Sequence, residues 1–254
     1  SEGMATTFTE RCHHELERIP SPGEAGPDLL GEEMLYTRTR NLSFEAPDAT
    51  KEDCVVSFQC SFVSIITGGT GRLSFTLNNS PMTSTSSDAV AATPATGHTF
   101  GSETLTVHTL RTSPSSKGTF NLGITFQCSG VCTGAWLNHV TLTYSRNLAI
   151  PSSTGHLIFT TTSSKLSLQG AKEATIWDVT NPLEIKTVNT DKNGDAVGWS
   201  ADGDSHTYAA WNSSAKLPTP RAIGTVANQN LHADRDYDMV IVAPSLFTEQ
   251  ALRL

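Results

Sequence analysis

Short runs of alternating apolar and polar residues, separated by turn residues, constrain the fold of this chain more than any other feature. Such runs occur at Cys54–Phe58, Arg72–Leu77, Glu103–Leu110, Asn121–Phe126 and Asn138–Tyr144. Alternation with a period of two is typical of strands that bury one face and leave the other in water. Long stretches of helical periodicity are missing. The pattern therefore predicts a mainly β fold, an antiparallel and jelly-roll-like β-sandwich.

Pro-rich and turn-rich stretches divide the 254 residues into four parts. Residues 1–30 are polar and rich in Pro and Gly, which predicts an N-terminal arm. Residues 31–150 are expected to form the sandwich, with a Ser/Thr/Ala/Pro-rich loop at 78–97. Residues 151–215 carry further strand patterns and predict a second, smaller β-rich module. Residues 216–254 begin with Lys-Leu-Pro-Thr-Pro, which indicates a linker into different material.

The last part of the chain differs because its apolar residues are consecutive. Met239–Ala243 predicts a strand buried on both faces, as in the parallel sheet of an α/β domain. Ser245 can cap a following helix, and Glu249 would lie near its first turn, where a carboxylate is favourable. The sequence thus predicts the first strand and helix of a truncated α/β domain, the start of a longer protein. Packing contacts are expected from Val240, Val242, Phe247 and Leu252.

Composition argues against several classes of partner. The net charge is −8, and no cluster or stripe of Lys and Arg occurs, so nucleic acid and anionic membranes are poor candidates. No apolar run reaches the roughly 18 residues that a membrane-spanning helix needs. The start Ser1–Met4 resembles a trimmed mature end or a cloning remnant. The lack of a signal peptide therefore does not argue for the cytoplasm.

The cysteines are odd in number, so at least one thiol is free or pairs outside the chain. They are Cys12, Cys54, Cys60, Cys128 and Cys132. Cys54 and Cys60 are expected on one strand, about 20 Å apart at about 3.3 Å per residue, which is too far for a disulfide while the strand is straight. Cys128 and Cys132 flank Gly130 and could close a loop.

Two similar short segments suggest another possible disulfide. Ser57–Ser61 and Thr125–Ser129 share the pattern Phe-Gln-Cys-Ser, so Cys60 and Cys128 would come within disulfide reach if the two segments were neighbouring strands. Chance similarity of two β segments and buried thiols that act as small apolar side chains stay open as alternatives. The sequence contains no Cys-X-X-Cys motif and no His pair with ligand spacing, so we predict no zinc site.

The segment from Asp191 to Asp195 allows two interpretations. Asp191, Asn193 and Asp195 place oxygen ligands at alternate positions, as calcium loops do, but Ala196 stands where such a loop needs Gly. Asn193-Gly194 between two predicted strands is also a strong signal for a hairpin turn. The hairpin is the favoured interpretation, and calcium binding is the alternative.

The histidines and tryptophans give no catalytic assignment. The five histidines considered as partners for a thiol are His13, His14, His108, His139 and His232. A cysteine peptidase needs a His beside its thiol, but no cysteine here follows an α/β strand, so we predict no catalytic residue and no cofactor. Trp136, Trp177, Trp199 and Trp211 could form a sugar-binding platform. Trp136 and Trp177 lie inside strand patterns, which favours buried packing positions for both.

Four segments, taken in order, resemble one known family. They are Gly134–Leu148, which contains Trp-Leu-Asn-His-Val-Thr-Leu-Thr-Tyr-Ser-Arg, and then Ile176–Pro182, Asn228–His232 and Asp238–Val242. Together they resemble the region upstream of the peptidase domain in type IX secretion system sortases of Bacteroidota, which are gingipain-like cysteine peptidases. The resemblance spans roughly residues 13–254.

The resemblance implies a large protein of the outer membrane and cell surface that removes C-terminal sorting signals from exported cargo. In that family the catalytic His and Cys lie downstream of the segment that matches Asp238–Leu254. The chain would then be a non-catalytic N-terminal portion that positions its own catalytic domain, or binds cargo or other secretion components. A stand-alone carbohydrate-binding or adhesin-like sandwich is the alternative. A row of exposed tryptophans would favour it.

Overall fold

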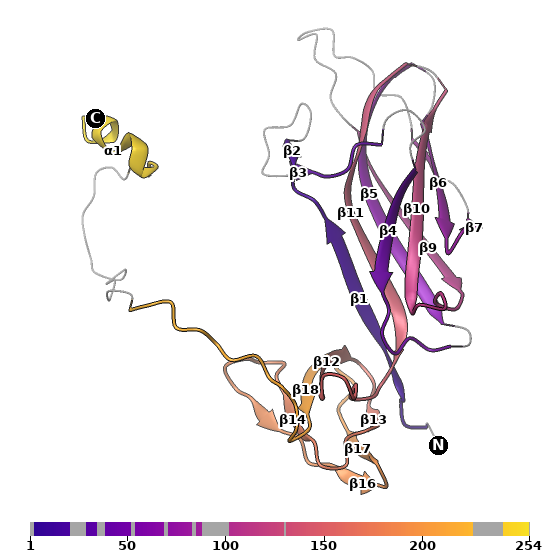
Figure 1. The fold of residues 1–254 in the computed structure, drawn as a ribbon, viewed down its shortest axis with the longest axis vertical. Helices are drawn as coiled ribbons and strands as arrows, with labels where there is room; N and C mark the ends of the chain where they lie inside the picture. Colours follow the sequence, from indigo (N-terminus) through magenta and orange to yellow (C-terminus); the bar gives the residue numbers. More distant parts are fainter. Residues whose placement is uncertain are drawn as a thin grey trace. The chain divides into compact units, whose positions relative to one another are not determined.

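The computed structural model describes residues 3–20, 29–34, 39–51, 54–68, 71–82, 85–87, 102–129, 131–225 and 241–253. The chain divides into two units, Ser1–Leu217 and Pro218–Leu254. The first unit contains a β-sandwich, from indigo to pink in Figure 1, and a smaller β module in orange. All pairings between the named strands are antiparallel, and the predicted mainly β fold is confirmed.

Two sheets form the sandwich. The first has the order β1-β11-β5-β9, formed by Thr7–Glu15, Val131–Asn147, Val55–Gly68 and Ser102–Arg111. The second has the order β4-β10-β6-β7, formed by Thr39–Glu45, Thr119–Cys128, Gly71–Leu77 and Ser80–Pro81, with β8 (Thr85–Ser87) also paired to β6. A separate short pair joins β2 (Ile19–Pro20) to β3 (Leu29–Leu30).

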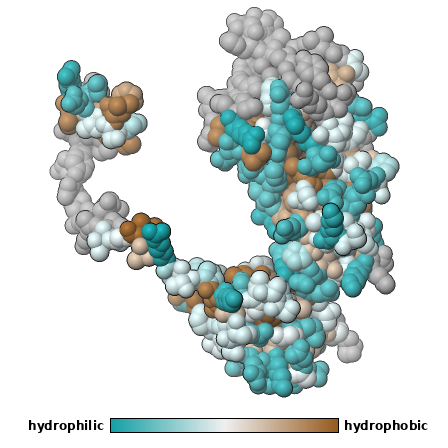
Figure 2. All heavy atoms as spheres, in the orientation of Figure 1, coloured by the Kyte–Doolittle hydropathy of each residue, from teal (hydrophilic) through white to brown (hydrophobic). Residues whose placement is uncertain are grey.

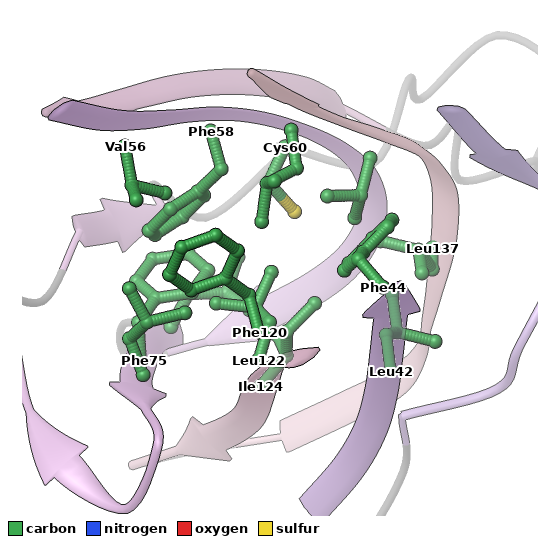
Figure 3. Packing of buried hydrophobic residues seen from close by; sticks show 14 of the residues in the cluster. Leu42, Phe44, Val56, Phe58, Cys60, Phe75, Phe120, Leu122, Ile124 and Leu137 are labelled. Atoms are coloured by element: carbon green, nitrogen blue, oxygen red, sulfur yellow. The ribbon is translucent and has the colours of Figure 1, made fainter. Parts of the chain in front are cut away.

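The alternating runs bury their apolar residues between these sheets, as the sequence predicts. In β10, Phe120, Leu122, Ile124 and Phe126 are all buried while the polar residues between them are more exposed. Figure 3 shows side chains of β5, including Phe58, pointing toward those of β6 and β10. Burial of apolar area on this scale is the main term that stabilises such a fold.

A bulge in β11 changes which residues face the core. Its pairing with β5 shifts register between Leu137 and His139. Before the shift the odd-numbered Ala135 and Leu137 are buried, and after it the even-numbered Val140 and Leu142 are buried. An extra residue on one strand reverses the inward parity in this way. Because of the bulge, side chains from both halves of this 17-residue strand point into the same core.

Two segments that the sequence predicts as irregular contain strands. Within the predicted arm of residues 1–30, Thr7–Glu15 is β1 and pairs with β11 over its whole length. Within the predicted loop at 78–97, Ser80–Pro81 and Thr85–Ser87 pair with β6, and residues 88–97 lie outside the described ones. The pattern of β1 is polar except for Phe8 and Cys12, so its strand structure depends on the backbone ladder that β11 supplies.

The second module has its own core between two smaller sheets. One has the order β12-β18-β14-β15, formed by His156–Thr161, His206–Trp211, Thr175–Asp178 and Lys186–Thr187. The other has the order β13-β17-β16, formed by Lys165–Leu168, Ala196–Ser200 and Asp191–Asn193. Phe159, Leu166, Trp199 and Tyr208 are among the buried residues between them.

The N-terminal strand ties this module to the sandwich. Phe8 of β1 belongs to the second core, with Leu148, which follows β11. The backbone of Ala5 exchanges hydrogen bonds with Lys165 and Ser167, at 2.8 and 3.0 Å. The buried guanidinium of Arg146 forms ion pairs with Glu10 at 2.8 Å and Asp48 at 3.2 Å. These contacts explain why both modules fall into one unit.

The second unit does not show the expected strand. Ile241–Ala243 are not in a strand, and Met239 and Val240 lie outside the described residues. The predicted strand needs the neighbouring strands of an α/β sheet, so for the intact protein it stays a prediction. A 3₁₀ turn, η1 (Ser245–Phe247), and a single helical turn, α1 (Thr248–Ala251), follow. Glu249 lies in the first turn of α1, but Ser245 provides no cap, because η1 begins after Pro244 without a side-chain cap bond.

Within their own unit, Val242, Phe247 and Leu252 are not covered by other described residues, and Val240 lies outside the described residues. Their expected packing against another part of the protein stays a prediction. Local backbone bonds close the turns, such as Leu252 N–H to Thr248 at 3.0 Å. In the described part of the chain, no helix has the length and apolar character to cross a membrane.

We predict that Leu122→Ala lowers the free energy of unfolding by about 2–5 kcal/mol, because it leaves a cavity in the sandwich core. Leu105→Ala is the matched control, since Leu105 is 57% exposed on β9 and Leu122 is fully buried. The control is expected to change stability by less than about 0.5 kcal/mol. Urea denaturation of both variants measures this. Equal losses would contradict the assigned core.

We also predict that a chain ending at Leu217 keeps the cooperative unfolding of the first unit, because both core clusters lie within residues 1–217. Far-UV circular dichroism and thermal unfolding of the full and shortened chains provide the comparison. A broadened transition, or a large drop in melting temperature, would show that Pro218–Leu254 belongs to the same folding unit.

Candidate functional site

The sheet β12-β18-β14-β15 of the second module has two unlike faces. Its inner face contributes Phe159, Ile176 and Tyr208 to the core. Register places Ile158 opposite Ala209 and Ala209 opposite Trp177, so these residues form one row on the outer face. Ile158 is 63% exposed. The outer face thus carries apolar side chains where an antiparallel sheet usually carries polar ones.

Trp177 lies on this outer face, which corrects the expectation that it is buried. It is 37% exposed and meets half-buried Trp211 edge to face, with ring centroids 4.7 Å apart. Ile176, its neighbour in β14, is the residue that points into the core. Trp136 is half-buried, and Trp199 is the buried tryptophan of the second module. Strand pattern alone places a residue on a strand, but not on a particular face.

The connection between β14 and β15 exposes further apolar side chains. Leu183 is 91% exposed and Ile185 50%. In Figure 2, brown apolar surface interrupts the teal and white surface of the second module, at the bottom of the view. We call the set Ile158, Trp177, Leu183 and Ile185 the exposed apolar residues of this module. Of these, Ile158 and Trp177 lie in one row of the outer face, and exposed apolar side chains that lie together are typical of surfaces that contact other molecules.

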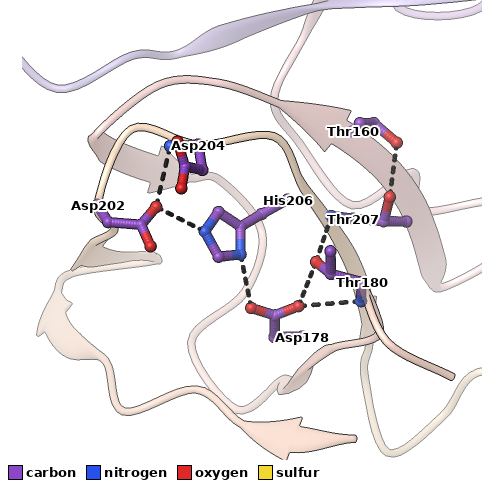
Figure 4. A network of polar contacts seen from close by, with 7 residues as sticks. All are labelled: Thr160, Asp178, Thr180, Asp202, Asp204, His206 and Thr207. Carbon is purple, nitrogen blue, oxygen red and sulfur yellow. Dashed lines mark hydrogen bonds and ion pairs between the residues drawn. The ribbon is translucent and has the colours of Figure 1, made fainter. Parts of the chain in front are cut away.

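One end of the inner face carries a polar network centred on His206. Figure 4 shows the ring between two carboxylates, with Nδ1 2.8 Å from Asp178 Oδ2 and Nε2 2.8 Å from Asp202 Oδ1. The backbone N–H and hydroxyl of Thr180 both donate to Asp178 Oδ1, at 3.0 and 2.5 Å. The N–H of Asp204 donates to Asp202 Oδ1 at 2.9 Å. The ring of Tyr208 stacks on the imidazole.

This geometry requires a protonated ring. Two carboxylates accept from the two ring nitrogens, so both nitrogens must carry hydrogen. The hydrogen bonds to Asp202 and then to Asp178 raise the pKa of His206 above its ordinary value. His206 and the N–H of Asp204 lower the pKa of Asp202. Burial raises the pKa of Asp178, but the hydrogen bonds from Thr180 and His206 outweigh burial and lower it overall.

The network is a charge clamp rather than a catalytic arrangement. A general base needs a ring nitrogen that is free to accept a proton from a substrate or a nucleophile. Both nitrogens of His206 already face carboxylates. Sequence reasoning missed this cluster because Asp178, Asp202 and His206 are separated by up to 28 residues. One sequence signal could have drawn attention to Asp178. It lies within Ile176–Pro182, a segment that carries part of the family resemblance.

Three of the five cysteines are free thiols and one forms a disulfide. Cys12, Cys54 and Cys60 are free thiols, whereas Cys128 is disulfide-bonded. Cys60 lies on β5 and Cys128 on β10, which are not neighbouring strands, and Cys60 is a free thiol, so the alternative Cys60–Cys128 pairing is not formed. The side chain of Cys132 lies outside the described ones. Burial raises the pKa of Cys60 to about 12, which makes it an unreactive packing residue at neutral pH.

The predicted histidines are polar strand residues without a thiol partner in the described part of the chain. His13 contacts Thr141 Oγ1 and Glu15, at 2.9 and 3.0 Å, and His14 contacts Glu32 at 2.7 Å. The ring centroids of His13 and His139 are 5.6 Å apart. His108 lies among aromatic rings and stacks on Phe58, where burial lowers its pKa. His232 lies outside the described residues.

Asp191, Asn193 and Asp195 lie at a hairpin. Asn193 pairs with Ala196, and Gly194, with φ of 67°, occupies the first of the two turn positions between them. Glycine adopts this positive φ without steric cost. Asp191, Asn193 and Asp195 are all exposed. The favoured turn interpretation is confirmed. Among the described residues, no group of three or more His, Cys, Asp or Glu side chains is placed to hold a metal ion.

The sequence matches no protein family and no curated protein. Its fold is similar to that of dimeric latent PorU from Porphyromonas gingivalis, with a TM-score of 0.75 and 17% identity over 92% of this chain. The chain spans 23% of the PorU chain. Identity at this level shows a shared fold and no more.

Two viral structures give much weaker similarities. The structure of infectious bursal disease virus Gx strain is 10% identical, with a TM-score of 0.31 over 80% of this chain and 39% of that one. The T13 IBDV viral particle is 12% identical, with a TM-score of 0.26 over 83% of this chain and 39% of that one. TM-scores this low do not indicate a common fold.

The two tryptophans of the second module give a matched test of the outer face. We predict that Trp199→Ala lowers the free energy of unfolding by about 3–5 kcal/mol, as for other buried aromatic residues. Trp177→Ala is expected to cost about 1 kcal/mol, because it loses mainly the edge-to-face contact with Trp211. Chemical denaturation of both variants measures the difference. A loss at Trp177 as large as at Trp199 would mean that Trp177 is a core residue.

Proposed function

We propose that this chain is a non-catalytic β portion of a type IX secretion protein of the sortase family, located at the outer membrane and cell surface. The observation that carries the proposal is the similarity to PorU over 92% of the chain at a TM-score of 0.75. The sequence segments Gly134–Leu148 and Ile176–Pro182 support it independently, because they resemble the same family. Processing of exported cargo would then belong to a catalytic domain elsewhere in the protein.

Its role would be to contact proteins rather than to perform chemistry. The His206 ring has no free nitrogen, and burial holds the Cys60 thiol protonated. The exposed apolar residues of the second module support a contact role, since Ile158 and Leu183 are more than half exposed. The partner proposed is the catalytic domain of the same protein, with cargo or other secretion components as the alternative partners.

The complete gene and its product provide the test. The proposal expects a downstream α/β domain that carries a His and a Cys, and removal of C-terminal signals from cargo by the full-length protein. Deletion of residues 3–217 from the full-length protein is expected to abolish this processing. Adding residues 3–217 back as a separate polypeptide tests whether covalent linkage is needed. A gene without a peptidase domain would refute the proposal.

A carbohydrate-binding role is the second candidate, and one observation favours it. Trp177 is exposed on the second module beside half-buried Trp211, and its ring could stack on a sugar face. Binding of the chain to a glycan array, lost in Trp177→Ala and retained in Trp136→Ala, would support this candidate. No binding to any glycan would leave the protein-contact role as the better account.

We predict that the chain itself has no peptidase activity. The physical reason is that no Cys–His pair occurs among its described residues, and free Cys54 donates instead to the carbonyl of Ser145 at 3.4 Å. Incubation with peptides that offer Arg, Lys and apolar cleavage sites, under reducing conditions, measures this. Turnover that a thiol-alkylating reagent abolishes would contradict the prediction.

A further inference from the structure

The loop Ala201–Ser205 connects β17 to β18 and is held at both ends. The N–H of Ala201 donates to the carbonyl of Ser164 at 2.8 Å. Near the other end, the Asp202 carboxylate accepts from the His206 ring at 2.8 Å and from the N–H of Asp204 at 2.9 Å. The side chain of His206 therefore spans from β18 back across this loop.

His206 joins three separate pieces of chain. It lies on β18, Asp178 lies at the end of β14, and Asp202 lies in the loop. The charged and titratable groups that face the ring are Asp178 and Asp202, with Tyr208 stacked on it and Asp204 bound through its backbone. Among the described residues, no Lys or Arg forms an ion pair with either carboxylate. The single positive charge of protonated His206 is thus shared by two carboxylates.

The loop also forms part of the wall of a cleft in the first unit. Ser205, next to His206, lines this cleft with Thr7 and Ser145 of the sandwich and Thr162 of the second module. The wall is rich in hydroxyl side chains. A change in the position of the loop would therefore change the shape of the cleft.

The two carboxylates are held with unequal strength. Asp178 is 20% exposed and accepts two hydrogen bonds from Thr180 in addition to the one from His206. Asp202 is 64% exposed and its described second partner is the N–H of Asp204, within the same loop. A neutral imidazole has one N–H, so its other nitrogen would face a carboxylate oxygen as acceptor against acceptor. Asp202 is the partner that can move away into water.

We infer that His206 is a proton-operated latch: the protonated ring holds the Ala201–Ser205 loop closed through Asp202, and loss of the proton releases the loop and reshapes the wall of the cleft. The inference rests on the contacts of His206 and not on the proposed function. Both ion pairs of His206 raise the pKa of the ring when the loop is closed. The latch is therefore closed below the ordinary pKa of histidine and opens as pH rises through the raised value.

Nuclear magnetic resonance of the complete chain tests the latch with two independent readouts. The first is the pKa of His206 from its ring carbon and proton shifts. The second is the hydrogen-exchange protection of the loop amides of Ala201 and Asp204, which both donate hydrogen bonds in the closed loop, expressed as protection factors so that the intrinsic pH dependence of exchange cancels. The protection factor is expected to fall by a definite factor as His206 loses its proton. By linkage, that factor equals the acid dissociation constant of His206 in the open loop divided by its value in the closed loop. Asp202→Asn supplies the open-loop constant.

Two variants of matched chemistry separate the latch from a general charge effect. Asp202→Asn is expected to lower the pKa of His206 toward its ordinary value and to remove most of the pH dependence of loop protection. Asp204→Asn removes a carboxylate from the same loop, but the contact of Asp204 in the network comes from its backbone, so both readouts are expected to stay as in the natural chain. Loop protection that ignores the titration of His206, or equal effects of the two variants, would overturn the inference.

Discussion

The pairing between β1 and β11 is the interaction on which the rest of the first unit depends. Nine consecutive residues of β1 pair with β11, and the segment just before β1 binds β13 of the second module. Phe8 fills part of the second core, while Cys12 packs against the first. One strand with a weak apolar pattern thus belongs to two cores. Its polar side chains do not favour a strand on their own, so the backbone ladder decides its structure.

The charged network and the exposed apolar side chains lie on different faces of the second module. The outer face of β14 and β18 exposes Trp177, while the end of the inner face carries the Asp178–His206–Asp202 clamp. Adjacent residues 177 and 178 serve these two purposes because successive side chains of a strand point to opposite faces. Exposed apolar side chains and a titratable group therefore lie on opposite sides of the same short strand. A partner that displaced β14 would disturb the clamp as well.

Sequence patterns predicted the sandwich strands well because period-two alternation reports one buried face directly. Leu73, Phe75 and Leu77 of β6 are all buried, as the alternation of Arg72–Leu77 implies. Trp177 was misplaced because a four-residue strand gives too few positions to decide which face is inward. The clamp of His206 depends on tertiary pairing of β14 with β18, which no local pattern encodes. The consecutive apolar run near residue 240 suggested a strand that the described Ile241–Ala243 do not form.

The long sequence separation within the β1–β11 pair also determines when the protein can fold during synthesis. Thr7 pairs with Asn147, so β1 leaves the ribosome long before its partner exists. The second core must wait longer still, because it needs both Phe8 and Tyr208. Contacts between such distant residues are slow to form and leave edges exposed meanwhile. A growing chain therefore carries β1 without its β11 partner until Asn147 has been made, so the strand edge that later joins the sheet stays open during that time.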